Sequence, residues 1–259
     1  MVPFISIILT THNRANLLRR ALKSLLLQSC STFEIILCAD ESSRETKEIA
    51  HSLLRESDSF LSTPNLRGPA ETRNIGISLA VGKWICFMDD DNTYTEDYLA
   101  SISNLSLESN QIHYFNYNEI TEDRENEEPL IISTTKGDLS RFSIDQLLIS
   151  NFIPNNVIAL PTEIAKLHPF DAYLQSHEDW DWLISLKSKG YEFNYHQEYL
   201  LNRHISEWSS KNNDAIKSKS IALDFLSVYR KWPTNSEEIK LKRADFMKRL
   251  GLNIDSNFL

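Results

Sequence analysis

Residues 83–91, KWICFMDDD, form the stretch of this sequence that decides its fold. Residues 84–88 are apolar and typical of a short buried strand, and three carboxylates follow them without a spacer. Adjacent carboxylates repel one another unless water screens them or a cation compensates them. Two interpretations are open: a solvated turn that caps the next helix, or a site where Asp89 and Asp91 bind a divalent cation together with substrate phosphates. The surrounding sequence favours the second.

Apolar runs and amphipathic segments alternate around this stretch. Strands are predicted at residues 4–9, 33–39 and 60–61, and helices at residues 14–28, 43–55 and 70–80. This alternation with short connections is typical of a parallel sheet covered by helices on both faces. Ligands bind such sheets at the carboxyl ends of the strands. Residues 10–14, 40–43 and 89–91 are therefore expected to converge on one crevice.

The second half of the chain has a more varied pattern. Helices are predicted at residues 96–107, 142–149, 177–190, 215–231 and 236–250, and strands at residues 112–120, 130–133 and 191–195. Residues 151–161 read as a loop and strand that could face an acceptor, and residues 199–212 as polar and irregular. The acidic segment at residues 121–129 is expected to be an exposed loop whose carboxylates are only solvated.

Composition limits the class of protein. The chain has 259 residues, a net charge of −9 and a hydrophobic content of 41%, which indicate a soluble globular protein that does not bind nucleic acid broadly. Cys30, Cys38 and Cys86 lack metal-ligand spacing and are typical of core residues in a reducing compartment. No apolar run is long enough for a signal peptide or a membrane span, so a cytoplasmic location is expected.

Five segments occur in an order that is similar to a known family. They are SIILTTHNR (6–14), EIILCADESS (34–43), RGPAETRNIGISLAVGKWICFMDDD (67–91), HEDWDWL (177–183) and YLLNRHISEWS (199–209). Together they resemble family-2 glycosyltransferases, which use nucleotide sugars and have the GT-A fold. The resemblance implies an α/β, Rossmann-like, mostly parallel central sheet flanked by helices, with a smaller acceptor-side subdomain and C-terminal helices.

The resemblance also implies a division of labour within one compact domain. Residues 1–99 would bind the nucleotide sugar, residues 100–210 would bind the acceptor and carry the catalytic base, and residues 211–259 would form a helical extension. The implied nucleotide-binding residues are Thr10, Asn13, Arg14, Asp40, Arg73, Asp89 and Asp90. Asp40 would accept hydrogen bonds from uracil or ribose, Arg73 would reach the pyrophosphate, and Asp90 would contact ribose. The donor implied is a UDP-sugar.

Each of these roles has a structural alternative. Asp40 is also a suitable helix N-cap, and Arg14 and Arg73 could be solvent-facing helix residues. Asp40 is followed by Glu41, where the family more often has a second aspartate, so the nucleobase is less firmly implied than the nucleotide.

The metal implied by the resemblance is Mn²⁺ or Mg²⁺. Asp89 and Asp91 match the D-x-D element of the family, and His204 matches a late histidine that completes the coordination in many relatives. Imidazole suits Mn²⁺ better than Mg²⁺. A purely structural role for His204 is the alternative.

The catalytic base implied by the resemblance is Asp179, at a predicted helix start beside Glu178. A carboxylate at a helix N-terminus is expected to stay ionised, as a base should, although the same position would also merely stabilise the helix. Trp180 and Trp182 could bind the acceptor sugar or pack in the core. The implied reaction is a single displacement with inversion at the anomeric carbon, in which an acceptor hydroxyl replaces the nucleoside diphosphate.

Two other functions remain open. A sugar nucleotidyltransferase would need a glycine-rich loop after the first strand, which TTHNRANLL lacks, and a non-catalytic sugar-nucleotide scaffold would not need both Asp91 and Asp179. The acceptor is expected to be a saccharide or lipid-linked glycan of bacterial surface polysaccharide synthesis. A peripheral contact with the inner face of the membrane is a further hypothesis, set against an ordinary solvated helix, because the last helix carries Lys240, Lys242, Arg243, Lys248 and Arg249.

Overall fold

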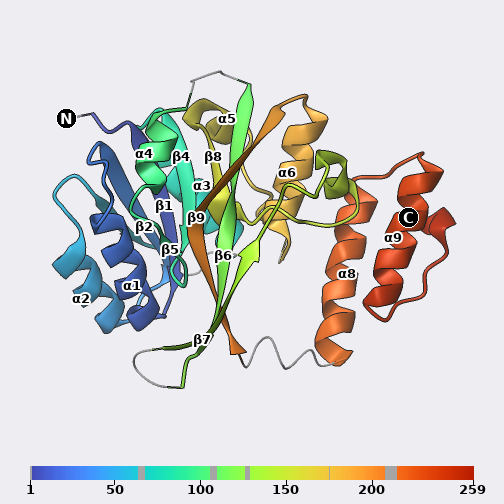
Figure 1. The fold of residues 1–259 in the computed structure, drawn as a ribbon, viewed down its shortest axis with the longest axis horizontal. Helices are drawn as coiled ribbons and strands as arrows, with labels where there is room; N and C mark the ends of the chain where they lie inside the picture. Colours follow the sequence, from blue (N-terminus) through green and yellow to red (C-terminus); the bar gives the residue numbers. More distant parts are fainter. Residues whose placement is uncertain (1, 64–67, 106–109, 126–128, 175, 208–214) are drawn as a thin grey trace.

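The computed structural model describes residues 2–63, 68–105, 110–125, 129–174, 176–207 and 215–259 (Figure 1). These residues form a nine-stranded sheet in the order β3-β2-β1-β4-β8-β6-β9-β5, with β7 paired to β6 outside this path. The strands are β1 (Ile5–His12), β2 (Phe33–Glu41), β3 (Ser59–Ser62), β4 (Trp84–Asp89), β5 (Thr93–Tyr94), β6 (Gln111–Asp123), β7 (Leu130–Gly137), β8 (Ile158–Pro161) and β9 (Glu192–Ser206). The predicted α/β fold with helices around a central sheet is confirmed, and the sheet is mixed, with four parallel and four antiparallel strand pairs among the described residues.

Helices cover this sheet and extend it at one end. They are α1 (Ala15–Leu26), α2 (Arg44–Leu53), α3 (Pro69–Leu79), α4 (Tyr98–Ser103), α5 (Thr162–Leu167), α6 (Glu178–Ser188), α8 (Ala215–Lys231) and α9 (Glu237–Arg249), with 3₁₀ turns η1 (Ile144–Leu148), η2 (Asn155–Val157) and η3 (Ser256–Phe258). In Figure 1, α1 and α2 lie beside the β1–β3 end of the sheet, and α8 and α9 stand together at the opposite side.

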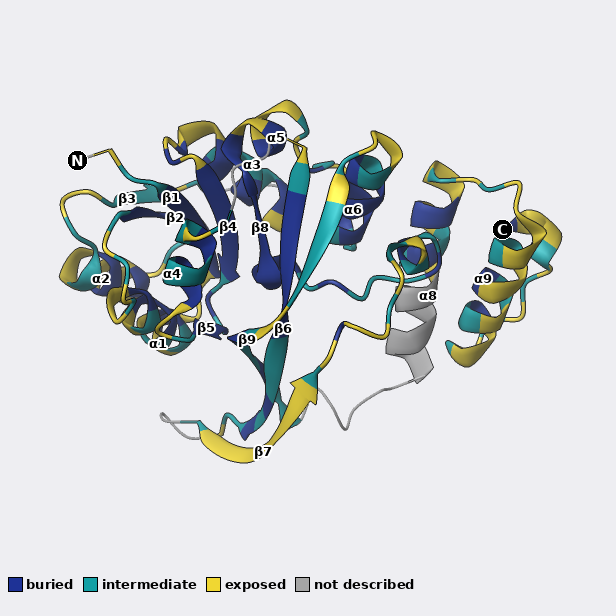
Figure 2. Ribbon diagram, turned by 45° about the horizontal axis from the view of Figure 1, so that its top comes forward, coloured by how far each residue is buried: buried dark blue, intermediate teal, exposed yellow. Residues whose placement is uncertain are grey.

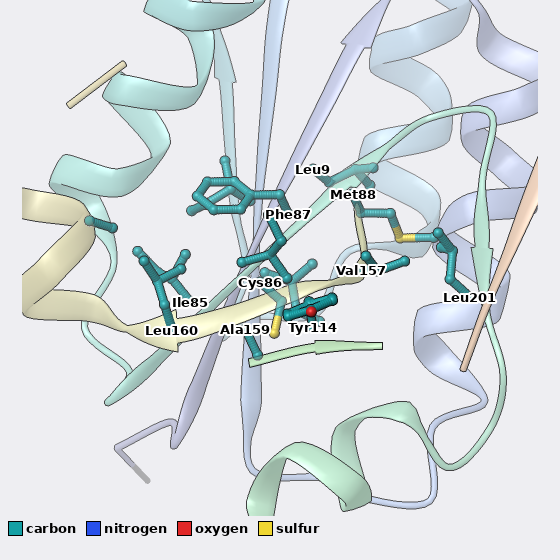
Figure 3. Close-up of a cluster of buried hydrophobic side chains, with 14 of the residues drawn as sticks. Leu9, Ile85, Cys86, Phe87, Met88, Tyr114, Val157, Ala159, Leu160 and Leu201 are labelled. Atoms are coloured by element: carbon teal, nitrogen blue, oxygen red, sulfur yellow. The ribbon is translucent and has the colours of Figure 1, made fainter. Parts of the chain in front are cut away.

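The core lies where β1 and β4 run side by side. Strands β1, β2 and β4 are parallel, and seven consecutive residues of β1 are buried, because helices cover both faces there. Figure 3 shows Leu9 and Met88 near Val157 and Leu201, which come from the second half of the chain. One apolar core therefore holds both halves together.

Gly76 brings α3 close to the sheet. A Cβ at this position would lie 2.6 Å from Cγ2 of Ile8 and 3.2 Å from Sγ of Cys38. Because no larger residue fits without a shift, the sequence RNIGIS places the helix directly on β1 and β2. Arg73, about one turn earlier, is thereby held against the carboxyl ends of the strands.

Strand β8 joins the two halves. It is antiparallel to β4 on one side and to β6 on the other, while β6 and β9 are parallel to each other. The sheet is therefore continuous from the first half into the second. The strand predicted within residues 151–161 is present as β8, but its antiparallel direction was not predicted, because a run of four apolar residues does not indicate the direction of a strand.

Two predicted segments are wrong in the second half. Residues 199–206, expected to be irregular, continue β9, and residues 121–123 of the expected acidic loop continue β6. The missed parts of the β6–β9 pair are partly exposed and keep polar residues within the strands, so they lack the long buried run that marks a strand in the sequence. Residues 126–128 and 208–212 of those predicted segments lie outside the described part of the chain.

The C-terminal helices are fastened to the core by polar contacts. Arg243 of α9 has no exposed surface and donates to the carbonyl oxygens of Leu148, Trp232 and Leu259. Arg243, one of the five basic residues behind the hypothesis of a membrane contact, therefore points inward and does not contribute to the surface of α9. Within the described ranges, no helix combines the length and the hydrophobicity that crossing a membrane requires.

Candidate active site

The carboxyl ends of β1 and β4 are joined by side-chain hydrogen bonds. Thr10 Oγ1 donates to Asp89 at 3.0 Å, and Thr11 Oγ1 donates to Asp90 at 2.6 Å. Arg14, just before α1, forms ion pairs with Asp90 at 2.5 Å and Asp91 at 3.1 Å. The predicted convergence of these strand ends is confirmed.

Two cavities open at this edge and share a wall. Cavity A, of about 440 Å³, is lined by residues that include Asp91, Asn151, Asn156, Asp179, Arg203 and His204. Cavity B, of about 470 Å³, is lined by residues that include Thr10, His12, Arg14, Asp40 and Thr72. Arg73 and Asp89 line both cavities. A molecule that fills both would have its middle beside Arg73 and Asp89.

Arg73 is the fixed cation between the cavities. Its side chain is buried and donates to Asp89 at 3.0 Å and to Glu178, at the start of α6, at 2.5 Å. Burial alone would lower the pKa of Arg73, but the carboxylates of Asp89 and Glu178 outweigh it and raise the pKa. The guanidinium therefore stays charged and links β4 to α6 through α3.

The three aspartates after β4 have different environments. Burial acts to raise the pKa of Asp89, but Arg73 and the amide of Asn156 outweigh it and lower that pKa. Asp90 is fully buried, and burial raises its pKa to about 6 against the attraction of Arg14. Burial also raises the pKa of Asp91, which lies near Arg14 and, at 3.7 Å, Arg124. Asp89 and Asp91 line cavity A, whereas Asp90 is buried and forms an ion pair with Arg14.

Asp179 faces cavity A from the first turn of α6. Its carboxylate accepts hydrogen bonds from the side chain of Asn151 at 3.1 Å and from the backbone N–H of Trp180. Burial, reinforced by the charge of Glu178, raises the pKa of Asp179 to about 6. The carboxylate is therefore ionised at neutral pH but takes up a proton more readily than an exposed aspartate, because desolvation outweighs the helix dipole.

A sequence model described as Glycosyl transferase family 2 matches residues 6–154. The chain belongs to this family. The match covers more than half of the chain and includes the strand ends that line both cavities.

Individual relatives share parts of this family-2 chain. Over 104 residues it is 34% identical to the GalNAc(5)-diNAcBac-PP-undecaprenol beta-1,3-glucosyltransferase of Campylobacter jejuni, a match covering 39% of this chain and 34% of that protein. The chain spans about a third of the length of several curated relatives that it matches.

Two solved structures have a similar fold. TarS of S. aureus in complex with UDP-GlcNAc aligns with a TM-score of 0.64 and 16% identity, over 95% of this chain and 72% of that chain. A mannosyltransferase from Pyrobaculum calidifontis in complex with GDP-Man and Mn²⁺ aligns with a TM-score of 0.61 and 15% identity, over 89% of this chain and 64% of that chain. At these identities the likeness shows the fold alone.

Trp180 and Trp182 of this family-2 chain are core residues. They expose 0% and 1% of their surface, and their indole N–H groups donate to the carbonyl oxygens of Leu147 and His168. The predicted acceptor contact is corrected for both, because neither ring has a face left for a sugar. Their packing instead fixes the start of α6, and with it Asp179.

Two predicted nucleotide-binding residues have contacts of their own. Asp40, at the end of β2, lines cavity B and lies 2.7 Å from Nδ1 of His12. Asn13, with a φ of 49°, accepts a hydrogen bond from the backbone N–H of Ser43 at 2.9 Å. Asn13 thus connects the end of β1 to the start of α2.

His204 lines cavity A, and Glu122 binds the ring nitrogen Nδ1 of His204. Its Nδ1 lies 3.0 Å from Glu122, and its Nε2 lies 3.1 Å from the hydroxyl of Thr93. Glu122 is 1% exposed and is also bound by Arg20 at 2.7 Å and Arg124 at 2.8 Å. Burial acts to raise the pKa of Glu122, but Arg20, His204 and Arg124 outweigh it and lower that pKa.

The network fixes the tautomer of His204. An ionised carboxylate only accepts, so Nδ1 must carry the proton that Glu122 binds. Burial lowers the pKa of His204, and Arg20 adds to this, so the ring stays neutral and Nε2 keeps a lone pair. Arg20 also donates to the carbonyl oxygen of Asp91 at 2.8 Å, which couples this network to the aspartates.

Sequence reasoning missed Glu122, Arg20 and Arg124. It assigned Glu122 to an exposed acidic loop, but Glu122 is 1% exposed, which overturns that assignment. The one signal in the sequence was Ile120, two residues before Glu122, since alternate residues of a strand share a face.

Proposed function

We propose that this chain transfers a sugar from a UDP-sugar to an acceptor hydroxyl, with inversion at the anomeric carbon. The observation that carries the proposal is the arrangement around Arg73. This cation and Asp89 lie where cavities A and B meet, and Asp179 lines cavity A only. A nucleotide in cavity B would have its diphosphate beside Arg73 and its sugar in cavity A.

Cavity B suits a nucleoside. Asp40 offers carboxylate oxygens to an imide N–H or a ribose hydroxyl, and Thr10 and Arg14 lie between it and the aspartates. The UDP-GlcNAc complex of TarS, which has a similar fold, supports this choice of donor. Uracil is therefore the proposed base.

A divalent cation fits the donor set of cavity A. Asp91 supplies carboxylate oxygens, and His204 supplies the neutral nitrogen Nε2, whose lone pair would become available to the ion once the hydroxyl of Thr93 turns away from it. Among the described residues, no group of three His, Cys, Asp or Glu side chains could hold an ion. Mg²⁺ and Mn²⁺ sites commonly combine one or two protein ligands with waters and phosphates, so Asp91 and His204, with Asp89 nearby, would hold the proposed ion. When bound, it would neutralise charge on the diphosphate.

The protein groups have distinct roles in the proposed displacement. Arg73 stabilises negative charge on the departing nucleoside diphosphate, and its own position is fixed by Glu178 and Asp89. Asp179 accepts the proton of the attacking hydroxyl, and Asn151 orients its carboxylate. Attack on the side of the sugar opposite the diphosphate gives inversion.

Nucleotide binding tests the proposal most directly. UDP with Mn²⁺ should raise the melting temperature, while UDP without metal should raise it less and AMP should not raise it. Asp89→Asn should reduce the shift, and Asp97→Asn, which alters an aspartate outside both cavities, should not. The absence of any UDP-dependent shift would refute the proposed donor. Metal-dependent binding without turnover of any UDP-sugar would favour the scaffold instead.

The pH dependence should report Asp179. Since burial raises its pKa to about 6, the carboxyl is protonated below that pH and is ionised above it. We therefore expect kcat/KM to rise with pH through about 6 and then level off. Glu178, Arg73 and Asp89 are the charged groups around Asp179, and Glu178 raises its pKa. Glu178→Gln should therefore shift the rise of kcat/KM to lower pH. If the rise does not move, another group, such as Asp90, is responsible for it.

Removal of the charge on Glu122 should disorder His204. Glu122→Gln allows an amide N–H to face Nδ1, so both neutral tautomers become populated, which side-chain ¹⁵N NMR of the metal-free chain resolves. We expect the affinity for Mn²⁺, with UDP present, to fall about 10- to 100-fold. Glu125→Gln changes an exposed carboxylate of the same acidic segment and should alter neither measurement. An unchanged tautomer in Glu122→Gln would contradict the role of Glu122.

A further inference from the structure

A third cavity, cavity C, lies beside cavity A and has no part in the proposed displacement. It has a volume of about 510 Å³, and His204 lines both cavities. One wall is a face of α1 with Asn16, Arg19 and Lys23, and the other is the start of β7 with Ile131. This volume is within the range of small-molecule sites.

The α1 wall of cavity C is cationic. Arg19, Arg20 and Lys23 recur at helical spacing and therefore share one face of α1. Arg20 is bound to Glu122 and to the carbonyl oxygen of Asp91. Arg19 and Lys23 are exposed, and neither forms an ion pair with any residue in the described ranges. Two positive charges are thus available to an anion in this cavity.

The β7 wall is apolar although it is exposed. Leu130, Ile131 and Ile132 expose 60%, 65% and 49% of their surface, and Figure 2 shows β7 as an exposed strand at the margin of the molecule. Within the described sheet, β7 pairs only with β6. Consecutive large aliphatic residues on an exposed edge strand are unusual unless something covers them. Ile131 lines the cavity, and its two neighbours, on the alternate face, continue the apolar surface around the strand.

We propose that cavity C binds the diphosphate and the adjoining apolar chain of a lipid-linked acceptor. Arg19 and Lys23 bind the diphosphate, and Ile131 contacts the chain. This assignment rests on the proposed transferase function and names the class of its acceptor. Because His204 lines both cavities, a sugar attached to that diphosphate would lie next to cavity A, where Asp179 accepts the proton.

Charge complementarity favours this surface over α9. In α9, Lys240 and Lys242 are paired with Glu237 and Glu238, and Arg243 is buried. Lys248 and Arg249 stay exposed on α9, so the preference for the α1–β7 groove rests on cavity C, where Arg19, Lys23 and Ile131 line one cavity. Cavity C therefore offers an amphipathic anion a cationic wall and an apolar wall within one site.

Farnesyl diphosphate is a soluble probe of this assignment. Its binding to the full chain is measured calorimetrically with UDP and Mn²⁺ at saturation, so that cavity B is occupied, and is compared with that of inorganic pyrophosphate and farnesol. We expect farnesyl diphosphate to bind at least about tenfold more tightly than either. Arg19→Gln with Lys23→Gln, and separately Ile131→Ser, should each weaken it by about tenfold. Lys248→Gln with Arg249→Gln, and Leu167→Ser, change exposed residues elsewhere and should not.

Each other outcome has a definite meaning. Loss of farnesyl diphosphate binding when UDP is added would place the probe in the donor site and overturn the assignment, as would equal binding by the cavity C and control variants. Binding of phosphatidylglycerol vesicles that depends on Arg19 and Lys23, without binding of farnesyl diphosphate, would make the groove a membrane contact and also overturn it. If UDP fails to bind while farnesyl diphosphate binds through cavity C, the donor proposal fails and the lipid site stands.

Discussion

Asp179→Asn should lower kcat about a thousandfold while leaving the affinity for UDP and Mn²⁺ nearly unchanged. The substitution keeps the size of the side chain and its capacity to bind Asn151, so α6 should keep its position. It removes the one property that a general base needs, which is an ionisable carboxylate. The measurement is the rate of release of UDP from the UDP-sugar that stabilises the chain most, with water or a saccharide as the acceptor.

Glu178→Gln is the matched control for Asp179→Asn. Both variants remove one carboxylate from the first turn of α6, so an effect on helix stability alone would be similar in the two. Glu178 binds Arg73 and does not line either cavity, so its loss should act mainly on donor binding. Equal losses of kcat in the two variants, or full turnover by Asp179→Asn, would remove Asp179 from the role of base.

The first half of the fold could be predicted because its signals are local. Residues 84–88 form a short apolar run in which every side chain is buried, as a strand covered on both faces requires. Once the strands are parallel, their carboxyl ends must share an edge, so the meeting of Thr10 with Asp89 follows from strand order alone. The match to glycosyl transferase family 2 confirms the family that the motifs resemble.

The roles of several side chains depend on partners from distant parts of the chain. Glu122 is buried between Arg20 of α1 and His204 of β9. No local pattern in the sequence indicates either partner. Trp180 packs against Phe225 and Tyr229 of α8. The local sequence around a tryptophan that packs in the core does not differ from the sequence around one that binds a sugar. In the same way, Arg243 continues a cationic pattern on α9 but donates to three inward-facing carbonyl groups.

Arg73→Met should reduce the free energy of unfolding at pH 7 by about 3–5 kcal/mol, as expected when one partner of a buried ion pair is removed. Arg73 and Glu178 expose 7% and 9% of their side chains, so Glu178 would be left without a counter-ion and with little water. Asp89 is 29% exposed, and solvent would screen part of its charge. Most of the loss therefore comes from Glu178, and urea denaturation measures it.

Part of the stability lost in Arg73→Met should return when the carboxylate of Glu178 is removed or protonated. Arg73→Met with Glu178→Gln should be more stable than Arg73→Met alone, since no buried carboxylate then lacks a partner at that position. Arg73 helps to lower the pKa of Asp89, and this contribution to stability is present at neutral pH and is lost as the pH falls through that lowered pKa. The gap in stability between the native chain and Arg73→Met should accordingly narrow as the pH falls toward and through that lowered pKa, because protonation relieves the variant first. A gap that stays constant over this range, with no recovery in the double variant, would mean that Arg73 contributes by packing against Phe170 and not by charge.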